Sequence, residues 1–210
     1  MKIEYLVYVI YVGFFLATMA AILAVPLLAF QQDMGAAYDA FGYTCHQKMS
    51  RSFCVFSDGA GYWIADCLQQ NGVFLSTAMD RRAVEVQTDT ALGYKIPVCA
   101  RDFGLYGAML IGALIYPRFR RVDERNTYPA IWLIIAIIPL ALDGGIQLVS
   151  ELGLLPFVYE STNAIRLATG VIAGVTASFY AIPILMNLFS STPKEQPKKA
   201  GGKPKAASAG

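Results

Sequence analysis

LVYVIYVGFFLATMAAILAVPLLAF, residues 6–30, is the stretch of sequence that decides the fold. It contains no charged side chain, and a helix of about 25 residues is roughly 37 Å long, whereas about 20 residues suffice to cross a bilayer core. A cleavable signal peptide has a shorter apolar core, roughly 7–15 residues, followed by a small-residue cleavage site. We therefore predict a retained transmembrane helix.

The composition of the whole chain agrees with this first segment. Of its 210 residues, 56% are hydrophobic and only 15% are charged, whereas soluble domains carry about 25% charged residues. The net charge of +2 is too small to indicate a nucleic-acid partner. The sequence therefore predicts a multi-pass protein whose main surroundings are the lipid bilayer of the cell membrane.

Three further apolar segments predict a membrane core within residues 96–190, with helices at about 96–117, 129–149 and 163–189. The first of these reaches spanning length only if it draws Arg101 and Asp102 into the outer leaflet. A re-entrant or interfacial segment near residues 103–116 is the alternative.

The distribution of basic residues favours four crossings. Lys2 precedes the first span, a cluster follows the second span (Arg118, Arg120, Arg121 and Arg125), and the tail after the fourth span is rich in lysine. Four crossings place all three groups on one side, which the positive-inside rule assigns to the cytoplasm. We therefore expect an all-α membrane protein with four transmembrane helices, the first within residues 1–30, and with both termini in the cytoplasm.

The segments outside the predicted spans have different characters. Residues 31–95 form a long extracytoplasmic loop, in which GAGYWIADCLQQNGVFL (59–75) resembles a short amphipathic helix. Residues 191–210 are rich in Lys, Pro, Gly and Ala. Such a segment buries too little apolar surface to offset its ordering entropy, and we expect a disordered cytoplasmic tail.

All four cysteines lie in the predicted loop or at its junction with the second helix, at Cys45, Cys54, Cys67 and Cys99. This placement suits disulfides in an oxidising compartment. Sequence does not choose among the three possible pairings. One of them joins Cys54 to Cys67 across a short loop and leaves Cys45 to pair with Cys99.

A metal site is the competing use of two of these cysteines. Cys45 adjoins His46, and Cys99 lies three residues before Asp102. Two thiolates, one imidazole and one carboxylate would suit tetrahedral zinc, although the C-x-x-C spacing of zinc fingers is missing. Metal binding and disulfide formation are both open for Cys45 and Cys99 from the sequence.

Polar residues gather at the predicted outer third of the membrane: Arg101, Asp102, Asp143, Gln147, Asn163 and Arg166. Ionisable groups at this depth pair with one another or mark a functional site. We expect Asp143 to pair with Arg166, and Arg101 with Asp102 or another carboxylate. In an outward-facing site, Asp143 is a candidate general base. The candidate ligands for an anionic lipid headgroup or small anion are Arg101, Gln147, Asn163 and Arg166.

Four segments resemble the motifs of a family of small predicted membrane proteins of archaea and bacteria that is known as a domain of unknown function. They are CHQKMSRSF (45–53), PVCARDFGLY (97–106), LDGGIQL (142–148) and STNAIRLATG (161–170). The resemblance implies that the family's signature positions are Cys45, His46, Arg51, Ser52, Cys99, Arg101, Asp143, Gln147, Asn163 and Arg166. Many members resemble PVCARC, with cysteine where this chain has Asp102, an exchange that favours a metal ligand over a disulfide partner.

Three functions fit these observations. The first is a membrane-embedded enzyme with zinc held by Cys45, His46 and Cys99. Asp102 is a fourth candidate ligand, but four protein ligands would close the site and make the zinc structural, so in an enzyme Asp102 would lie outside the coordination shell. The second is an accessory or lipid-binding subunit of a larger membrane complex, or a homo-oligomer, with structural disulfides. The third is transport, which we rank last because four helices without an internal repeat suit alternating access poorly.

Overall fold

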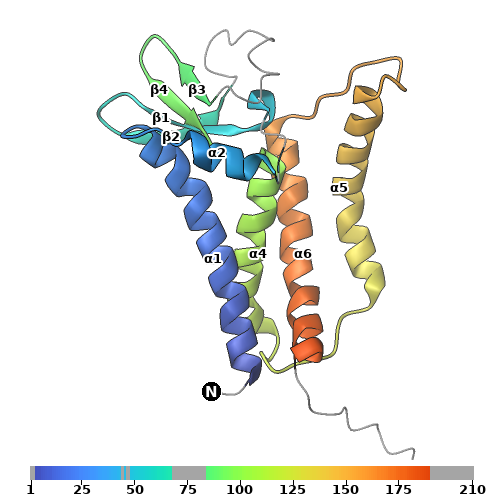
Figure 1. Cartoon of the computed structure of the whole chain (residues 1–210). Coiled ribbons are helices and arrows are strands. Elements are labelled where there is room, and N and C mark those ends of the chain that lie inside the picture. Colours follow the sequence, from blue (N-terminus) through green and yellow to red (C-terminus); the bar gives the residue numbers. More distant parts are fainter. Residues whose placement is uncertain (1–2, 44, 46–47, 68–83, 190–210) are drawn as a thin grey trace, which may run out of the picture.

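A computed structural model describes residues 3–43, 45, 48–67 and 84–189, and its elements are mostly helical (Figure 1). In chain order, the elements are α1 (Ile3–Ala29), α2 (Gly35–Gly42), η1 (Met49–Arg51), β1 (Phe53–Ser57), β2 (Tyr62–Asp66), β3 (Glu85–Gln87), β4 (Leu92–Lys95), α4 (Ala100–Phe119), α5 (Ala130–Glu151) and α6 (Asn163–Phe189). The predicted tail of residues 191–210 lies outside the described residues.

Three of the described helices are long and apolar enough to cross a membrane, namely α1, α5 and α6. The fourth long helix, α4, has 20 residues, but it carries Arg101 and Asp102 in its first turn and Arg118 in its last. It nevertheless runs beside α1 and α6 over their length (Figure 1). The predicted helix boundaries agree with those of the structure to within about four residues at each end.

Helices α4 and α6 pack closely because glycines face the neighbouring backbone at several levels. A Cβ atom at Gly104 would lie 2.6 Å from the carbonyl oxygen of Leu167, and one at Gly170 would overlap the carbonyl oxygen of Arg101. At the opposite end, α1 joins this pair through a core that contains Tyr11, Tyr116 and Ile182. Small residues are the usual means by which membrane helices approach one another.

A four-stranded antiparallel sheet in the order β2-β1-β4-β3 occupies much of the region between α1 and α4. The all-α prediction is therefore wrong for this region. Residues 62–66 form β2 and not the predicted amphipathic helix, whereas residues 68–75 lie outside the described residues. The turn before β2 explains the difference, because Gly59 has a φ of 88° and the Asp58 carboxylate accepts hydrogen bonds from the backbone amides of Ala60 and Gly61.

The sheet rests on one end of the helices, where α1 ends and α4 begins. Val55 of β1 packs with Ile22 of α1 and with Ile96 and Val98, which lead from β4 into α4. In Figure 1 the sheet lies beside the end of α1 and the start of α4. Cys45 contacts the start of α4, and Ser50 and Ser52 contact the first turn of α6, where predicted site residues lie.

Candidate functional site

Cys54 and Cys67 form a disulfide that joins β1 to the residue after β2. Both side chains are fully buried in a small core with Met49, Phe56 and Val86. The disulfide links neighbouring strands within the sheet and is separate from the other two cysteines. The predicted pairing of Cys54 with Cys67 is therefore present in the structure.

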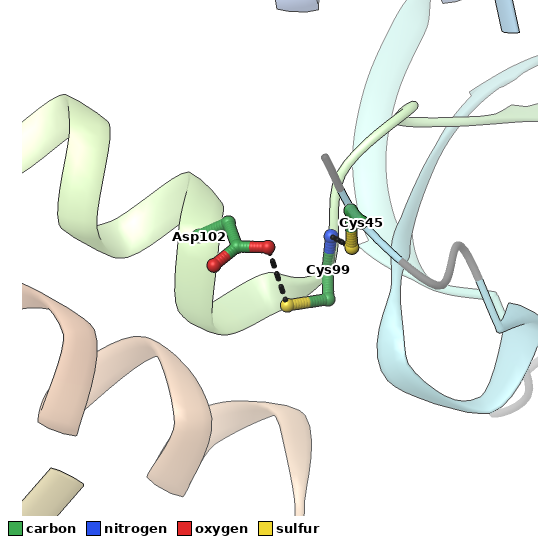
Figure 2. Close-up of side chains that lie close together, drawn as sticks. All are labelled: Cys45, Cys99 and Asp102. Atoms are coloured by element: carbon green, nitrogen blue, oxygen red, sulfur yellow. Dashed lines mark hydrogen bonds between the residues drawn. The ribbon is translucent and has the colours of Figure 1, made fainter. Parts of the chain in front are cut away.

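Cys45, Cys99 and Asp102 come together where the sheet meets α4. One potential ligand atom from each lies within 4.8 Å of those of the other two. The Cys99 thiol donates a hydrogen bond to the Asp102 carboxylate at 3.2 Å, and the Cys99 backbone amide donates to the Cys45 sulfur at 3.2 Å (Figure 2). Cys45 and Cys99 are not joined by a disulfide. The fourth predicted ligand, His46, lies outside the described residues.

The cluster lies at the N-terminus of α4, but the neighbouring Cys45 and burial have the larger effect on the Cys99 thiol. Cys99 directly precedes the helix and Asp102 lies in its first turn, where the helix dipole favours negative charge. The hydrogen bond with Cys45 and the burial of the thiol raise the pKa of Cys99 above its ordinary value. Without a cation to stabilise the thiolate, Cys99 is therefore held as a neutral thiol.

The second polar group contains Arg101, the residue before Asp102 in α4. Arg101 forms an ion pair with Asp143 of α5. The Asp143 carboxylate also accepts hydrogen bonds from the hydroxyls of Tyr159 (3.0 Å) and Ser161 (3.3 Å). Asp143 is buried. It is thus an acceptor for three donors from two parts of the chain.

The third polar group surrounds Arg166 of α6, whose side chain is only 2% exposed. Its guanidinium donates to Glu160 at 2.8 Å and to the side-chain oxygen of Asn163 at 3.1 Å. Arg51 binds the same Glu160 carboxylate through two hydrogen bonds, at 3.0 and 3.3 Å. In the amide orientation that satisfies its partners, the Gln147 oxygen accepts from Arg51 (2.6 Å) and Arg166 (2.9 Å).

Hydrogen bonds also tie this group to the sheet and keep its carboxylate ionised. The Asn163 amide donates to Asp66 at the end of β2, at 2.8 Å. Burial alone would raise the pKa of Glu160, but the hydrogen bonds from Arg51 and Arg166 outweigh it and hold the pKa below its ordinary value. The two arginines therefore enclose a carboxylate that stays charged at neutral pH.

One of the two predicted ion pairs is wrong, whereas Arg101 pairs, as expected, with a carboxylate. Asp143 pairs with Arg101 and not with Arg166, and Arg166 pairs with Glu160. Asp102, which the sequence placed both in the polar pocket and in the candidate metal site, lies with Cys45 and Cys99. The partners have this arrangement because the connection between α5 and α6 folds back over the helix ends and supplies Tyr159, Glu160 and Ser161.

Sequence reasoning left several members of these groups out of the predicted site: Arg51, Glu151, Tyr159, Glu160 and Ser161. Arg51 stands in the SRSF motif and forms a further ion pair with Glu151. That motif was the signal that could have placed it. Glu151 ends α5 and Glu160 lies within the α5–α6 connection, next to the predicted outer polar residues. Their charge beside a short apolar connection was the available signal.

The chain is similar to one protein family and to a protein from an archaeon. Residues 86–180 match the DUF2085 family, described as predicted membrane proteins. The chain is also 34% identical over 138 residues to the uncharacterized protein MJ1492 of Methanocaldococcus jannaschii, an alignment that covers 65% of this chain and 81% of that protein. The chain belongs to the DUF2085 family. No solved structure matches it significantly.

The segment that matches the DUF2085 family contains some members of the three polar groups and not others. The matched segment contains Cys99, Asp102, Asp143 and Arg166, whereas Cys45 lies before it. The family description gives membrane location and no activity. The chemistry that is open to this DUF2085 protein therefore depends on the arrangement of its side chains.

Proposed function

We propose that this DUF2085 protein binds a zinc ion at its outer surface through Cys45, Cys99 and Asp102. The observation that carries the proposal is the convergence of three potential ligand atoms within 4.8 Å of one another. They come from segments more than fifty residues apart in sequence, so the fold, and not local spacing, brings them together. Two thiolates and a carboxylate are a donor set that suits zinc.

The geometry is compatible with tetrahedral coordination. Bonds of about 2.3 Å to sulfur and about 2.1 Å to oxygen place neighbouring ligand atoms about 3.5 to 3.8 Å apart. The Cys99 sulfur and an Asp102 oxygen already lie 3.2 Å apart. All three potential ligand atoms lie within 4.8 Å of one another, about 1 Å beyond the separations of a tetrahedral site.

Three protein ligands would leave the fourth position for either water or His46, which was part of the original ligand prediction. An open position is the arrangement of catalytic zinc sites, in which bound water becomes a nucleophile. A fourth ligand from His46 would close the site and make the zinc structural. The number of protein ligands thus separates a hydrolase from a structural metal protein.

The test is metal analysis of the detergent-purified chain together with its variants. We expect about one zinc per chain in the wild type and a strong loss in Cys99→Ser and Asp102→Asn, because each removes a ligand. Asp39→Asn is the matched control for Asp102→Asn, because Asp39 is exposed on α2, away from the cluster. Equal zinc content in all four proteins, or none in the wild type, would overturn the proposal.

Cobalt substitution then distinguishes the open site from the closed one. Thiolate-bound cobalt has a visible spectrum that reports coordination number. We expect His46→Gln to leave this spectrum unchanged if water holds the fourth position and to change it if His46 is a ligand. A reduced, denatured sample gives the total thiol count, and an unreduced one should still show Cys45 and Cys99 as thiols.

The proposed orientation has four spanning helices, with the sheet outside and both termini inside the cell. Three observations support it. Helix α4 lies between α1 and α6 along their length (Figure 1), and about 20 residues span a bilayer core. The Cys54–Cys67 disulfide suits an oxidising compartment. The basic residues Arg118, Arg120 and Arg121 lie at the opposite end of α4 from the sheet.

The alternative function is a non-enzymatic accessory subunit, and α5 is the observation that favours it. Its buried residues are Asp143 and Gln147, both polar, whereas most of its apolar side chains are exposed. An accessory role predicts co-purification of a membrane partner and no dependence on zinc.

A further inference from the structure

We infer that Arg51 and Arg166 form a binding site for a phosphate group, and that Glu160 acts as an internal ligand which the phosphate displaces. The inference does not depend on the proposed zinc site. The expected anionic ligand is then a phosphate group, and Arg51 is one of the residues that bind it. The Glu160 carboxylate competes with the phosphate for the two arginines.

The cationic half of this site is rigid and largely removed from solvent. Arg166 is almost fully buried, and its position is fixed by hydrogen bonds to Asn163 and to the carbonyl oxygen of Ser50. Among the described residues, Glu160 is its one carboxylate partner, and its Nε atom has no hydrogen-bond partner. Arg51 faces the same point with a side chain that is 16% exposed. Two converging guanidiniums are the usual recognition element for phosphate.

The anionic half has the opposite character. The Glu160 side chain is 44% exposed and belongs to the connection between α5 and α6, which has no regular structure at that residue. Its carboxylate copies the contacts of a bound phosphate, since Arg51 holds both of its oxygens and Arg166 one of them. The Glu160 carboxylate can move away from the arginines into solvent with little loss of buried surface. The buried arginine side chains cannot move in the same way.

The charge balance favours replacement by an anion and not an empty site. With Glu160 in place, the ammonium of Lys48 and the guanidiniums of Arg51, Arg101 and Arg166 face three carboxylates, those of Asp143, Glu151 and Glu160. Glu160 is the carboxylate that pairs with Arg166. Removing Glu160 leaves an uncompensated positive charge next to the buried Arg166. A buried unpaired charge is costly. An external anion that replaces Glu160 therefore recovers most of the favourable electrostatic interaction with the arginines that is lost when Glu160 leaves.

The same connection indicates where the phosphate could come from. Just before Glu160 it exposes four large apolar side chains, at Leu152, Leu154, Phe157 and Val158. They follow the outer end of α5, at the level of the lipid headgroups in the proposed orientation. A phosphate on a lipid and a soluble phosphate share the chemistry that Arg51 and Arg166 recognise, and the experiment separates the two sources.

The experiment measures binding of inorganic phosphate to the full chain in detergent by calorimetry. Glu160→Gln removes the competing charge, so we expect phosphate to bind this variant about tenfold more tightly than the wild type, equivalent to about 1.4 kcal/mol. Glu124→Gln, which removes one carboxylate at the opposite end of α4, is the matched control and should bind like the wild type. Arg51→Gln in the Glu160→Gln background should abolish the gain.

Each other outcome counts against the site. No gain in Glu160→Gln, an equal gain in Glu124→Gln, or a gain that survives Arg51→Gln would overturn the inference. If Glu160→Gln does not yield folded protein, Glu160→Asp replaces it, since the shorter side chain retains the charge but cannot reach both arginines. A smaller gain is expected there, and its absence would overturn the inference equally.

Nanodiscs distinguish the two sources of phosphate. If a lipid phosphomonoester is the natural source, Glu160→Gln in bilayers containing phosphatidic acid should bind inorganic phosphate more weakly than in phosphatidylglycerol bilayers of matched surface charge, whose headgroup is a phosphodiester, because the phosphatidic acid headgroup occupies the site. Equal binding in the two bilayers would assign the site to a soluble phosphate compound. The zinc content of every sample is measured in parallel, so that loss of the metal site and loss of the phosphate site are recorded separately.

Discussion

Two buried charged side chains of the membrane helices, Asp143 of α5 and Arg166 of α6, each have a partner of opposite sign. Asp143 faces Arg101 and two hydroxyls, and Arg166 faces Glu160. Ionisable residues at membrane depth are expensive when alone. The Arg101–Asp143 ion pair therefore fixes the position of α5 relative to α4, independently of the function of the site.

Replacing Asp143 with Asn should destabilise the protein by about 3 kcal/mol, because it leaves the Arg101 guanidinium partly buried without a counter-charge. Thermal unfolding in detergent measures the loss. Asp123→Asn is the control, since Asp123 pairs with Arg121, whose side chain is 83% exposed, and such pairs contribute at most about 1 kcal/mol. If both variants unfold alike, the pair does not hold α5, and Asp143 is available for the predicted role of general base.

At the scale of elements, the contact between α4 and α6 depends on the absence of side chains. Gly170 and Gly174 lie where any Cβ atom would overlap backbone oxygens of α4, those of Arg101 and Leu105. The first turns of both helices carry site residues, so this close approach determines the distance between the Cys99–Asp102 cluster and Arg166.

Substitution of Gly170 by Ala should therefore cost about 1 to 3 kcal/mol, the usual range for overpacking a tightly packed interface. The comparison is Gly13→Ala in α1, where a new Cβ atom meets no atom within 4 Å. That control should be neutral or slightly stabilising, because alanine favours a helix. Equal melting temperatures for Gly170→Ala and the wild type would show that the helices can separate at no cost.

The sheet is the element that sequence reasoning missed, although a local signal was present. Asp58-Gly59 separates two runs rich in aromatic and β-branched residues, Phe53–Ser57 and Tyr62–Asp66, and an Asp-Gly pair in that setting is typical of a hairpin. The apolar residues of β2 also fit a helical pattern over a short window, because short apolar runs do not distinguish the two periods.

At the scale of the molecule, the number of membrane crossings decides where the site faces. Three helices qualify by length and hydropathy, and α4 makes the fourth only if it crosses with Arg101 and Asp102 near the outer surface. In the structure, Arg101 is compensated by Asp143 and Asp102 by its hydrogen bond from Cys99. Compensation of this kind lets a moderately apolar helix span.

Cysteine labelling in whole cells tests the crossing of α4. In a Cys45→Ser/Cys99→Ser background, we expect a membrane-impermeant maleimide to label Asp89→Cys, next to β4, and not Arg121→Cys, just after α4. Permeabilised cells should show labelling at both positions. Labelling of both positions in intact cells would place the two ends of α4 on one side and contradict the four-helix orientation.

The sequence alone determined the membrane class and the positions of the long helices. These follow from local composition, because about 20 apolar residues can satisfy their backbone in a membrane only as a helix. Only the tertiary structure decided which partners meet. Cys45 reaches Cys99 and Asp102 because the sheet packs on α1 and α4. Arg166 meets Glu160 because the α5–α6 connection folds back over the helix ends. Such pairings depend on contacts between distant segments, and hydrophobic periodicity carries no information about them.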